Sequence, residues 1–309
     1  MGLDFCLSSE EMVRGAIAGG VDYLQDNKEI KSLVVGVSGG VDSAVTTAIA
    51  SECCSEMRHR GRPVYLIGAH LSIGGNATNE AEHLKDILLA RNVMKKYCDR
   101  YTFIDLDEIY NKVIEVDDII SVKHKELLSV DEERQLDDDD LELSPSEKIR
   151  AGNIKARLRM IYLYNLANAS KGLVLSTDNL TEYNLGFWTL HGDVGDFGLI
   201  QNLWKTEVFR VANFIGGSVK ECTNKPPTDG LGITDTSLDQ ILPGWEKKFK
   251  SHIEAYEYVD TILIEYLGKE QSVDKDHPVI KRHLNSKFKR MNPYNVSREI
   301  LTWTHNLLN

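Results

Sequence analysis

Four short apolar runs punctuate the first 180 residues of the chain. They lie at residues 33–37, 64–69, 101–104 and 172–177. Each is rich in β-branched, aromatic or leucine side chains, which is typical of buried strands. The sequence therefore predicts four strands at these positions.

Stretches with helical spacing separate the strands. A helix is expected to begin at Ser8, which forms a capping-box pattern with Glu11, and another is expected to begin at Lys205 and end at Gly216. Further helices are predicted over 44–50, 79–97 and 146–169, and in the last of these the expected core-facing residues are Ile154, Leu158, Ile161 and Leu166. Because strand and helix alternate, the sequence predicts an α/β fold with a doubly wound parallel sheet. We expect one domain over residues 1–309, ending in helical elements.

The first strand runs into a glycine turn and a helix start, with the sequence S-G-G-V-D-S at residues 38–43. Glycine permits positive φ angles and a close backbone approach, and the unpaired N–H groups of a helix N-terminus bind anions. Ser38 and Ser43 add hydroxyl donors. A carboxylate at Asp42 would repel a phosphate unless a divalent cation lay between them. The turn therefore indicates a nucleotide with Mg²⁺, against the alternative of an ordinary strand-turn-helix with a serine cap.

Composition narrows the range of partners. The formal net charge of −11 argues against a nucleic-acid polymer as partner. The five cysteines include no C-x-x-C pair, so neither a disulfide framework nor a thiolate zinc site is indicated. No apolar stretch approaches the ~18 residues of a membrane span. We therefore expect a cytoplasmic protein without a membrane partner.

One segment of the chain is strongly acidic. Residues 131–142 read DEERQLDDDDLE, a charge density that opposes burial. A solvated, mobile loop is therefore expected at about residues 129–144. A regulatory or partner role is the alternative.

The turn lacks both the G-x-x-x-x-G-K-[ST] and the G-x-G-x-x-G pattern. It resembles instead the pyrophosphate-binding loop of the N-type ATP pyrophosphatases, which cleave ATP between its α and β phosphates. Further motifs follow in order: N-I-K-A-R-L-R-M, S-T-D-N-L-T-E, G-F-W-T-L-H-G-D, a lysine at a helix start, and F-K-R-M-N-P. Together they resemble the ammonia-dependent NAD synthetase family from about Ser8 to Pro293. That family converts deamido-NAD (nicotinic acid adenine dinucleotide), ATP and ammonia into NAD, AMP and pyrophosphate through an acyl-adenylate.

The resemblance implies a role for each matching residue. For ATP it implies Ser38, Gly39, Gly40, Asp42, Ser43, Thr177, Lys205 and Thr228, and for Mg²⁺ it implies Asp42 and Glu182. For deamido-NAD it implies Asn153, Arg157, Phe187, Asp193, Asp196, Lys289 and Arg290. The catalytic candidates are Asp193, which would bind ammonium, and Lys205, which would neutralise phosphates. The resemblance also implies a homodimer. No glutaminase domain is expected, so ammonia would be free or supplied by another protein.

Several positions depart from the family pattern. Phe288 stands where many bacterial members have histidine, and residues 72–78 lack the Arg or Gln that relatives carry near ATP. The loop at 192–196 is one residue short, and the segment after Asp229 is abbreviated. Two alternatives therefore stay open. One is another N-type ATP pyrophosphatase that amidates or thiolates a different substrate, and the other is a nucleotide-binding homologue without catalysis.

Overall fold

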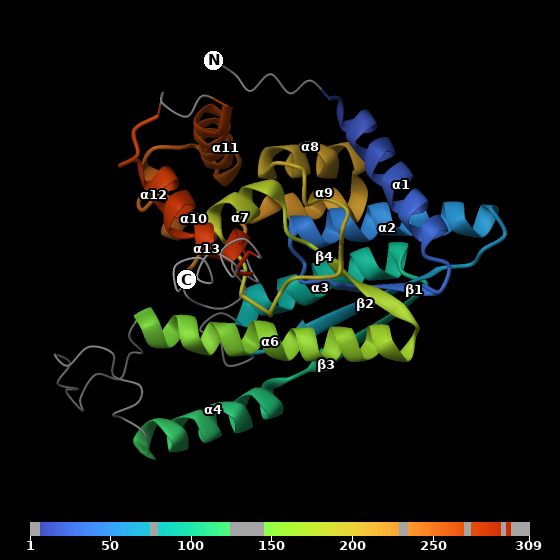
Figure 1. Ribbon diagram of the computed structural model, residues 1–309, viewed down its shortest axis with the longest axis horizontal. Helices are drawn as coiled ribbons and strands as arrows, with labels where there is room; N and C mark the ends of the chain where they lie inside the picture. Colours follow the sequence, from blue (N-terminus) through green and yellow to red (C-terminus); the bar gives the residue numbers. More distant parts are fainter. Residues whose placement is uncertain are drawn as a thin grey trace, which may run out of the picture.

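A parallel sheet forms the centre of the computed structural model (Figure 1). The structure describes residues 7–74, 80–123, 145–228, 234–268, 273–291 and 295–297. Within these ranges the sheet has five strands in the order β3-β2-β1-β4-β5, and every neighbouring pair is parallel. The strands are β1 (Ser32–Gly36), β2 (Tyr65–Ser72), β3 (Arg100–Asp105), β4 (Gly172–Ser176) and β5 (Phe197–Gly198).

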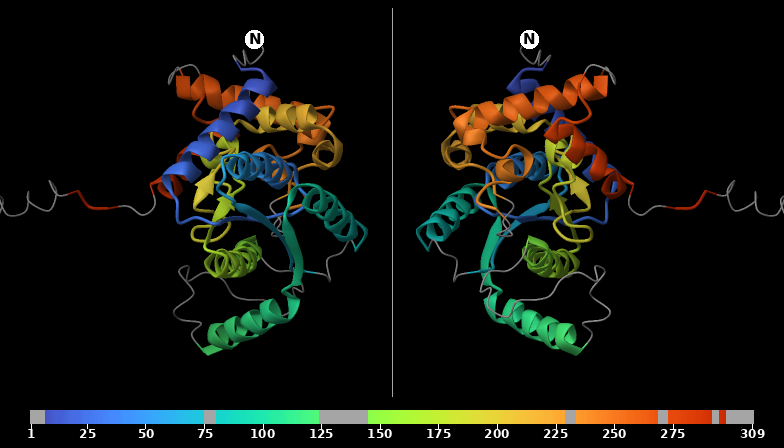
Figure 2. Two further views of the ribbon diagram at one scale, coloured as in Figure 1. Left: turned by 90° about the vertical axis from the view of Figure 1, so that its right-hand side faces the viewer. Right: turned by 90° about the vertical axis from the view of Figure 1, so that its left-hand side faces the viewer.

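Helices cover both faces of this sheet. Helices α2 and α3 pack on one face, and α6 packs on the other with α4 beside it (Figure 2). In chain order the α-helices are α1 (Ser9–Asp26), α2 (Val41–His59), α3 (Glu80–Tyr97), α4 (Asp107–Lys123), α6 (Pro145–Ala169), α7 (Leu180–Leu185), α8 (Lys205–Ile215), α9 (Gly217–Glu221), α10 (Ser237–Ile241), α11 (His252–Gly268), α12 (Pro278–Asn285) and α13 (Lys287–Arg290). Two 3₁₀ turns lie at Cys222–Asn224 and Trp245–Lys247.

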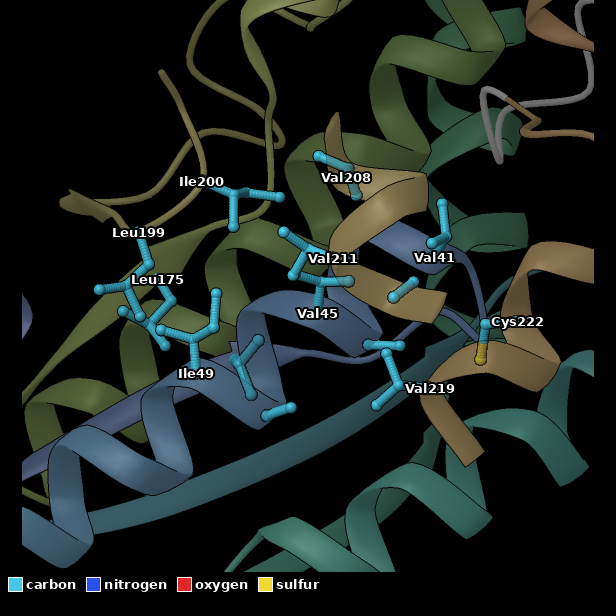
Figure 3. Packing of buried hydrophobic residues seen from close by; sticks show 14 of the residues in the cluster. Val41, Val45, Ile49, Leu175, Leu199, Ile200, Val208, Val211, Val219 and Cys222 are labelled. Atoms are coloured by element: carbon cyan, nitrogen blue, oxygen red, sulfur yellow. The ribbon is translucent and has the colours of Figure 1, made fainter. Parts of the chain in front are cut away.

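The largest core cluster joins α2 to α8. Val41, Val45 and Ile49 of α2 are buried together with Val208 and Val211 of α8 (Figure 3). Burial of each such side chain contributes roughly 1.5–3 kcal/mol to folding. Because α2 begins directly after the glycine turn and α8 begins at Lys205, this packing fixes the two helix N-termini relative to each other.

The four predicted strands are confirmed, with small shifts at their ends. The capping box is also confirmed: Glu11 N–H donates to Ser8 Oγ over 3.2 Å, and Ser8 N–H donates to Glu11 Oε2 over 2.7 Å. Helix α8 begins at Lys205 and is capped by Gly216, as predicted. The prediction that Ile161 faces the core is wrong, since 57% of its surface is exposed. The apolar stripe of α6 continues through Tyr162 and Leu163 instead, which turns position 161 toward solvent.

Two elements of the fold have no counterpart in the sequence-based prediction. Helix α4 and the two-residue strand β5 were not predicted. The acidic segment at about 129–144 lies outside the described residues, and the single domain stays a prediction. Within the described ranges, no helix combines the length and the apolar character needed to cross a membrane.

A buried histidine lies where β2 passes the end of β1. His70 Nδ1 is 2.8 Å from the Val37 carbonyl oxygen, so the neutral ring donates through Nδ1. Its buried Nε2 has no hydrogen-bond partner among the described residues. Burial lowers the pKa of His70, and His83 and Arg159 lower it further, while the Val37 bond and Asp86 oppose that shift.

This lowered pKa predicts a pH-dependent stability. The unfolded chain binds the extra proton first, so the contribution of His70 is complete above its unfolded pKa of about 6.5 and is lost as the pH falls through the folded pKa. We expect the Tm to fall between about pH 7.5 and about pH 5.5, and to fall less in His70→Asn, which keeps a donor for the Val37 carbonyl. The exposed His59 provides the control variant His59→Asn, which should keep the wild-type slope. An unchanged slope in His70→Asn would rule out this residue as the source.

Candidate active site

The candidate site lies at the carboxyl ends of β1 and β4. These strands are neighbours in the sheet, although the chain leaves β1 toward β2 and returns to β4 on the other side. In doubly wound folds, a reversal of this kind opens the crevice where ligands bind. Three segments meet there: the turn at 37–40, the segment at 177–182 after β4, and the start of α8.

The glycine turn after β1 is fixed by its own hydroxyl groups. Gly39 has a φ angle of +90°, a backbone conformation that residues other than glycine rarely adopt. Gly40 N–H donates to Ser38 Oγ over 3.2 Å, and Ser43 Oγ donates to the Gly40 carbonyl over 3.0 Å. The predicted hydroxyl donors therefore hold the turn in shape. Its N–H groups stand at the start of α2, where an anion gains both hydrogen bonds and a favourable helix dipole.

Two carboxylates converge on one buried lysine beside this turn. Lys205 Nζ lies 2.5 Å from Asp42 Oδ2 and 2.9 Å from Glu182 Oε1. Asp42 is in the first turn of α2, and Glu182 is in the first turn of α7. Asn179, the N-cap of α7, donates through Nδ2 to Asp42 Oδ1 over 2.8 Å. Three residues that are far apart in the sequence thus form one cluster.

Burial and charge act against each other in this cluster. Lys205 is fully buried, which alone would lower its pKa, but Asp42 and Glu182 outweigh that effect and hold the pKa above its usual value. Burial raises the pKa of Glu182 to about 7, against the opposing effect of Lys205. The Lys205 ammonium also lies 5.5 Å from the centre of the Tyr256 ring. The Lys205 ammonium is therefore held in its charged form next to the anion-binding turn.

A second layer holds Lys205 in place from behind. Its backbone N–H donates to Thr181 Oγ1 over 2.8 Å, and Thr181 Oγ1 donates to Asp260 Oδ1 over 2.5 Å. Asp260 Oδ2 accepts from both the N–H and the hydroxyl of Thr206. Burial raises the pKa of this fully buried carboxyl to about 6. Sequence reasoning missed Asp260.

The end of β4 contributes a further buried acid. Asp178 is 8% exposed, and its Oδ2 accepts from Ser176 Oγ over 3.0 Å. Burial holds its pKa well above the usual value, and the nearby charges of Asp193 and Glu182 act in the same direction. The predicted ATP residue Thr177 lies beside it, half-buried. Asp178 was missed as well, although it lies inside the quoted S-T-D-N-L-T-E motif.

Asp193 is anchored in the loop that follows α7. Its Oδ1 accepts the Thr189 N–H over 2.6 Å, and Thr189 Oγ1 donates to Asn153 Oδ1 of α6 over 2.8 Å. Although Asp193 remains exposed, desolvation by the surrounding protein raises its pKa. Two of the predicted ligand residues, Asp193 and Asn153, therefore bind the same loop residue, Thr189.

The predicted cations bind carbonyl groups of this loop and of α7. Lys289 Nζ donates to the carbonyls of Gly186 and Trp188 over 2.7 and 2.5 Å. Arg157 donates to the Leu190 carbonyl over 3.2 Å, and Arg290 donates to the Asn184 carbonyl over 2.7 Å. Lys289 and Arg157 therefore bind the loop that follows α7, and Arg290 binds α7 itself.

Three other predicted residues lie in different settings. The guanidinium of Arg282 lies 3.7 Å from the centre of the Phe187 ring. Asp196 accepts from Tyr164 Oη over 2.9 Å and from Val174 N–H over 3.1 Å, which ties it to α6 and β4. Thr228 is exposed.

The predicted metal ligands, Asp42 and Glu182, offer carboxylate oxygens, which are donors that Mg²⁺ prefers. Among the described residues, no group of three or more His, Cys, Asp and Glu side chains forms a metal site. Asp42 and Glu182 nevertheless aim carboxylate oxygens at one cation, the Lys205 ammonium. Mg²⁺ usually takes one or two carboxylates together with phosphate oxygens and water, so this donor pair fits it.

The fold is an α/β fold with a doubly wound parallel sheet, and a glycine turn suited to anions lies where the strand order reverses. A family model described as NAD synthase matches residues 17–293. The NH(3)-dependent NAD(+) synthetase of Alkaliphilus oremlandii is 32% identical over 278 residues, covering 88% of this chain and 93% of the relative. That of Thermoplasma acidophilum is 28% identical over 290 residues, covering 90% and 99%. The chain belongs to the NAD synthase family, and it is a ligase that forms a carbon–nitrogen bond.

Solved structures share the fold. NMN synthetase from Francisella tularensis superposes with a TM-score of 0.67 at 21% identity and covers 94% of this chain and 99% of its own. NAD+ synthetase from Burkholderia pseudomallei gives a TM-score of 0.61 at 21% identity, covering 93% and 91%. The predicted doubly wound sheet is confirmed.

Proposed function

We propose that this protein is an ammonia-dependent NAD synthetase that amidates deamido-NAD, with ATP cleaved to AMP and pyrophosphate. The observation that carries the proposal is the convergence of Asp42, Glu182 and Lys205 beside the glycine turn. Membership of the NAD synthase family and the full-length NH(3)-dependent relatives support it. A cytoplasmic location and a homodimer accompany the proposal as predictions.

The first chemical step needs positive charge more than a base. The nicotinate carboxylate attacks the α-phosphorus of ATP, and the bond to the leaving pyrophosphate breaks. The N–H groups around Gly39 and Gly40, with Ser38 and Ser43, would hold the phosphates, and Lys205 would neutralise them. Asp42 and Glu182 would hold Mg²⁺, which when bound offsets phosphoryl charge. Thr177 and Thr228 complete the proposed ATP set.

The second step delivers nitrogen to the acyl-adenylate. Ammonium loses a proton, ammonia attacks the acyl carbon, and AMP leaves. We assign ammonium binding to Asp193, whose raised pKa makes its carboxylate a better proton acceptor. The proposed deamido-NAD residues are Asn153, Arg157, Phe187, Asp193, Asp196, Lys289 and Arg290.

A product assay tests the proposal. The purified protein receives ATP and Mg²⁺ with deamido-NAD, or with the corresponding mononucleotide because one structural neighbour is named for NMN, and either ammonium or glutamine. NAD and AMP formed in equal amounts with ammonium support an ammonia-dependent synthetase. Turnover of the mononucleotide alone would replace the proposed substrate. ATP binding without cleavage would favour a nucleotide-binding homologue that lacks catalysis.

Glu182→Gln tests the metal assignment separately. Glutamine can keep the capping box with Asn179, so α7 should still fold. The substitution removes the negative charge of the side chain. We expect NAD formation to fall by about 100-fold and to require higher Mg²⁺ concentrations. Glu11→Gln, the same change in the exposed capping box of α1, is the matched control and should keep full activity. An active Glu182→Gln variant with the wild-type Mg²⁺ dependence would refute the assignment.

A further inference from the structure

A second ion pair lies beside the glycine turn, apart from the Lys205 cluster. Lys225 Nζ is 2.5 Å from Asp86 Oδ1, and the two side chains are 20% and 27% exposed. Asp86 belongs to α3, and Lys225 follows the 3₁₀ turn at Cys222–Asn224. Neither residue takes part in the proposed reaction.

The backbone places Asp86 directly against the turn. A Cβ atom added to Gly39 would lie 2.6 Å from the Asp86 carbonyl oxygen and 3.1 Å from its Cα atom. The Asp86 side chain therefore starts next to the N–H groups that are proposed to bind phosphate. A carboxylate at this position would repel the triphosphate of ATP, because unit charges several ångströms apart interact appreciably near a protein surface.

Lys225 is held where it can cancel that charge. Its segment continues through Pro226 to Pro227, whose carbonyl accepts the Ser237 N–H over 3.0 Å. The ammonium is thus fixed at Asp86 by the ion pair and by the anchored chain that follows. We propose that Lys225 neutralises Asp86 and thereby sets the affinity of the glycine turn for the triphosphate of ATP. This inference rests on the proposed binding of ATP phosphates at the turn.

Charge-specific variants test this positioning role. In Lys225→Met the Asp86 carboxylate is no longer neutralised, so we expect the KM for ATP to rise by about threefold to tenfold with little change in kcat or in the KM for deamido-NAD. In Asp86→Asn the lysine charge remains, so the KM for ATP should stay the same or fall. The double variant Lys225→Met with Asp86→Asn should return close to the wild-type value. The Lys225→Met effect should also shrink as ionic strength rises.

A purely mechanical role would give a different pattern. If the ion pair only fixed the segment, both single variants would break it, the KM for ATP would shift in the same direction in both, and the double variant would show no recovery. That result, or an unchanged KM for ATP in Lys225→Met, overturns the proposal.

Arg60→Met, which breaks the Arg60–Glu56 pair at the far end of α2, is the control and should leave the KM for ATP unchanged. Titration calorimetry of ATP binding on the same variants keeps the test independent of NAD formation. A Kd for ATP that rises in Lys225→Met and recovers in the double variant would support the inference even if the product assay failed.

Discussion

Replacing Lys205 with methionine is expected to lower the rate of NAD formation by about 1,000-fold or more. Lys205 is the fully buried cation at the proposed phosphate site, and its position is already fixed by Asp42, Glu182 and the Thr181 hydroxyl. Such a preorganised charge stabilises a developing phosphoryl charge without reorganisation. Methionine keeps the apolar stem against Tyr256 and removes only the charge. Lys220→Met, at an exposed position in α9, is the control and should keep wild-type activity.

The same variant should also respond to Mg²⁺ in a distinctive way. Without the ammonium, the carboxylates of Asp42 and Glu182 face each other without a shared cation, which should cost stability. Because Mg²⁺ can take the place of the lost cation between them, it should raise the Tm of Lys205→Met more than that of the wild type. Differential scanning calorimetry with and without Mg²⁺ measures this. An equal Mg²⁺ response in both proteins would contradict the idea that the carboxylates can share a divalent cation.

The parts of the fold that the sequence predicted are those with local signals. The run at 33–37 is apolar and β-branched, and the glycines after it break the strand before α2 begins. These signals involve neighbouring residues only. The Asp42–Lys205 pair spans 163 positions, and it forms because β4 lies next to β1 and α8 packs on α2. The motifs, through their resemblance to a family, suggested these residues, whereas spacing alone could not have brought them together.

Asp260 shows why other parts of the site escaped prediction. The buried residues of α11 are Ala255, Tyr256, Val259, Asp260 and Leu263, so this carboxylate lies on the apolar stripe of the helix. A charged residue on such a stripe is a signal that it has buried partners. Its partners, Thr181 and Thr206, lie 79 and 54 positions away, and only the packing of α11 against α7 and α8 reveals them.

We expect Asp260→Leu to lower the free energy of unfolding by about 3 kcal/mol at pH 7. The change leaves the Thr206 N–H, the Thr206 hydroxyl and the Thr181 hydroxyl without their shared acceptor in a site that water does not reach. It also loosens Thr181, the acceptor for the backbone N–H of Lys205, so activity should fall together with stability. Urea unfolding gives the first quantity and the product assay gives the second. Glu257→Leu, on the exposed side of the same helix, should change stability by no more than about 0.5 kcal/mol.

The pH dependence of Asp260→Asn separates the charge of this carboxyl from its hydrogen bonds. Burial raises the pKa of Asp260 in the folded state to about 6, above its ordinary value of 3.8, so the folded state binds the proton more tightly than the unfolded state. The stability contributed by this proton is complete below the unfolded pKa and is lost as the pH rises through the folded pKa. An amide cannot titrate, so Asp260→Asn should lack this loss between about pH 4 and about pH 6 while it keeps one acceptor for the threonines. If the wild type and Asp260→Asn showed the same pH slope in that range, Asp260 would be ionised throughout it, and its donors would outweigh its burial.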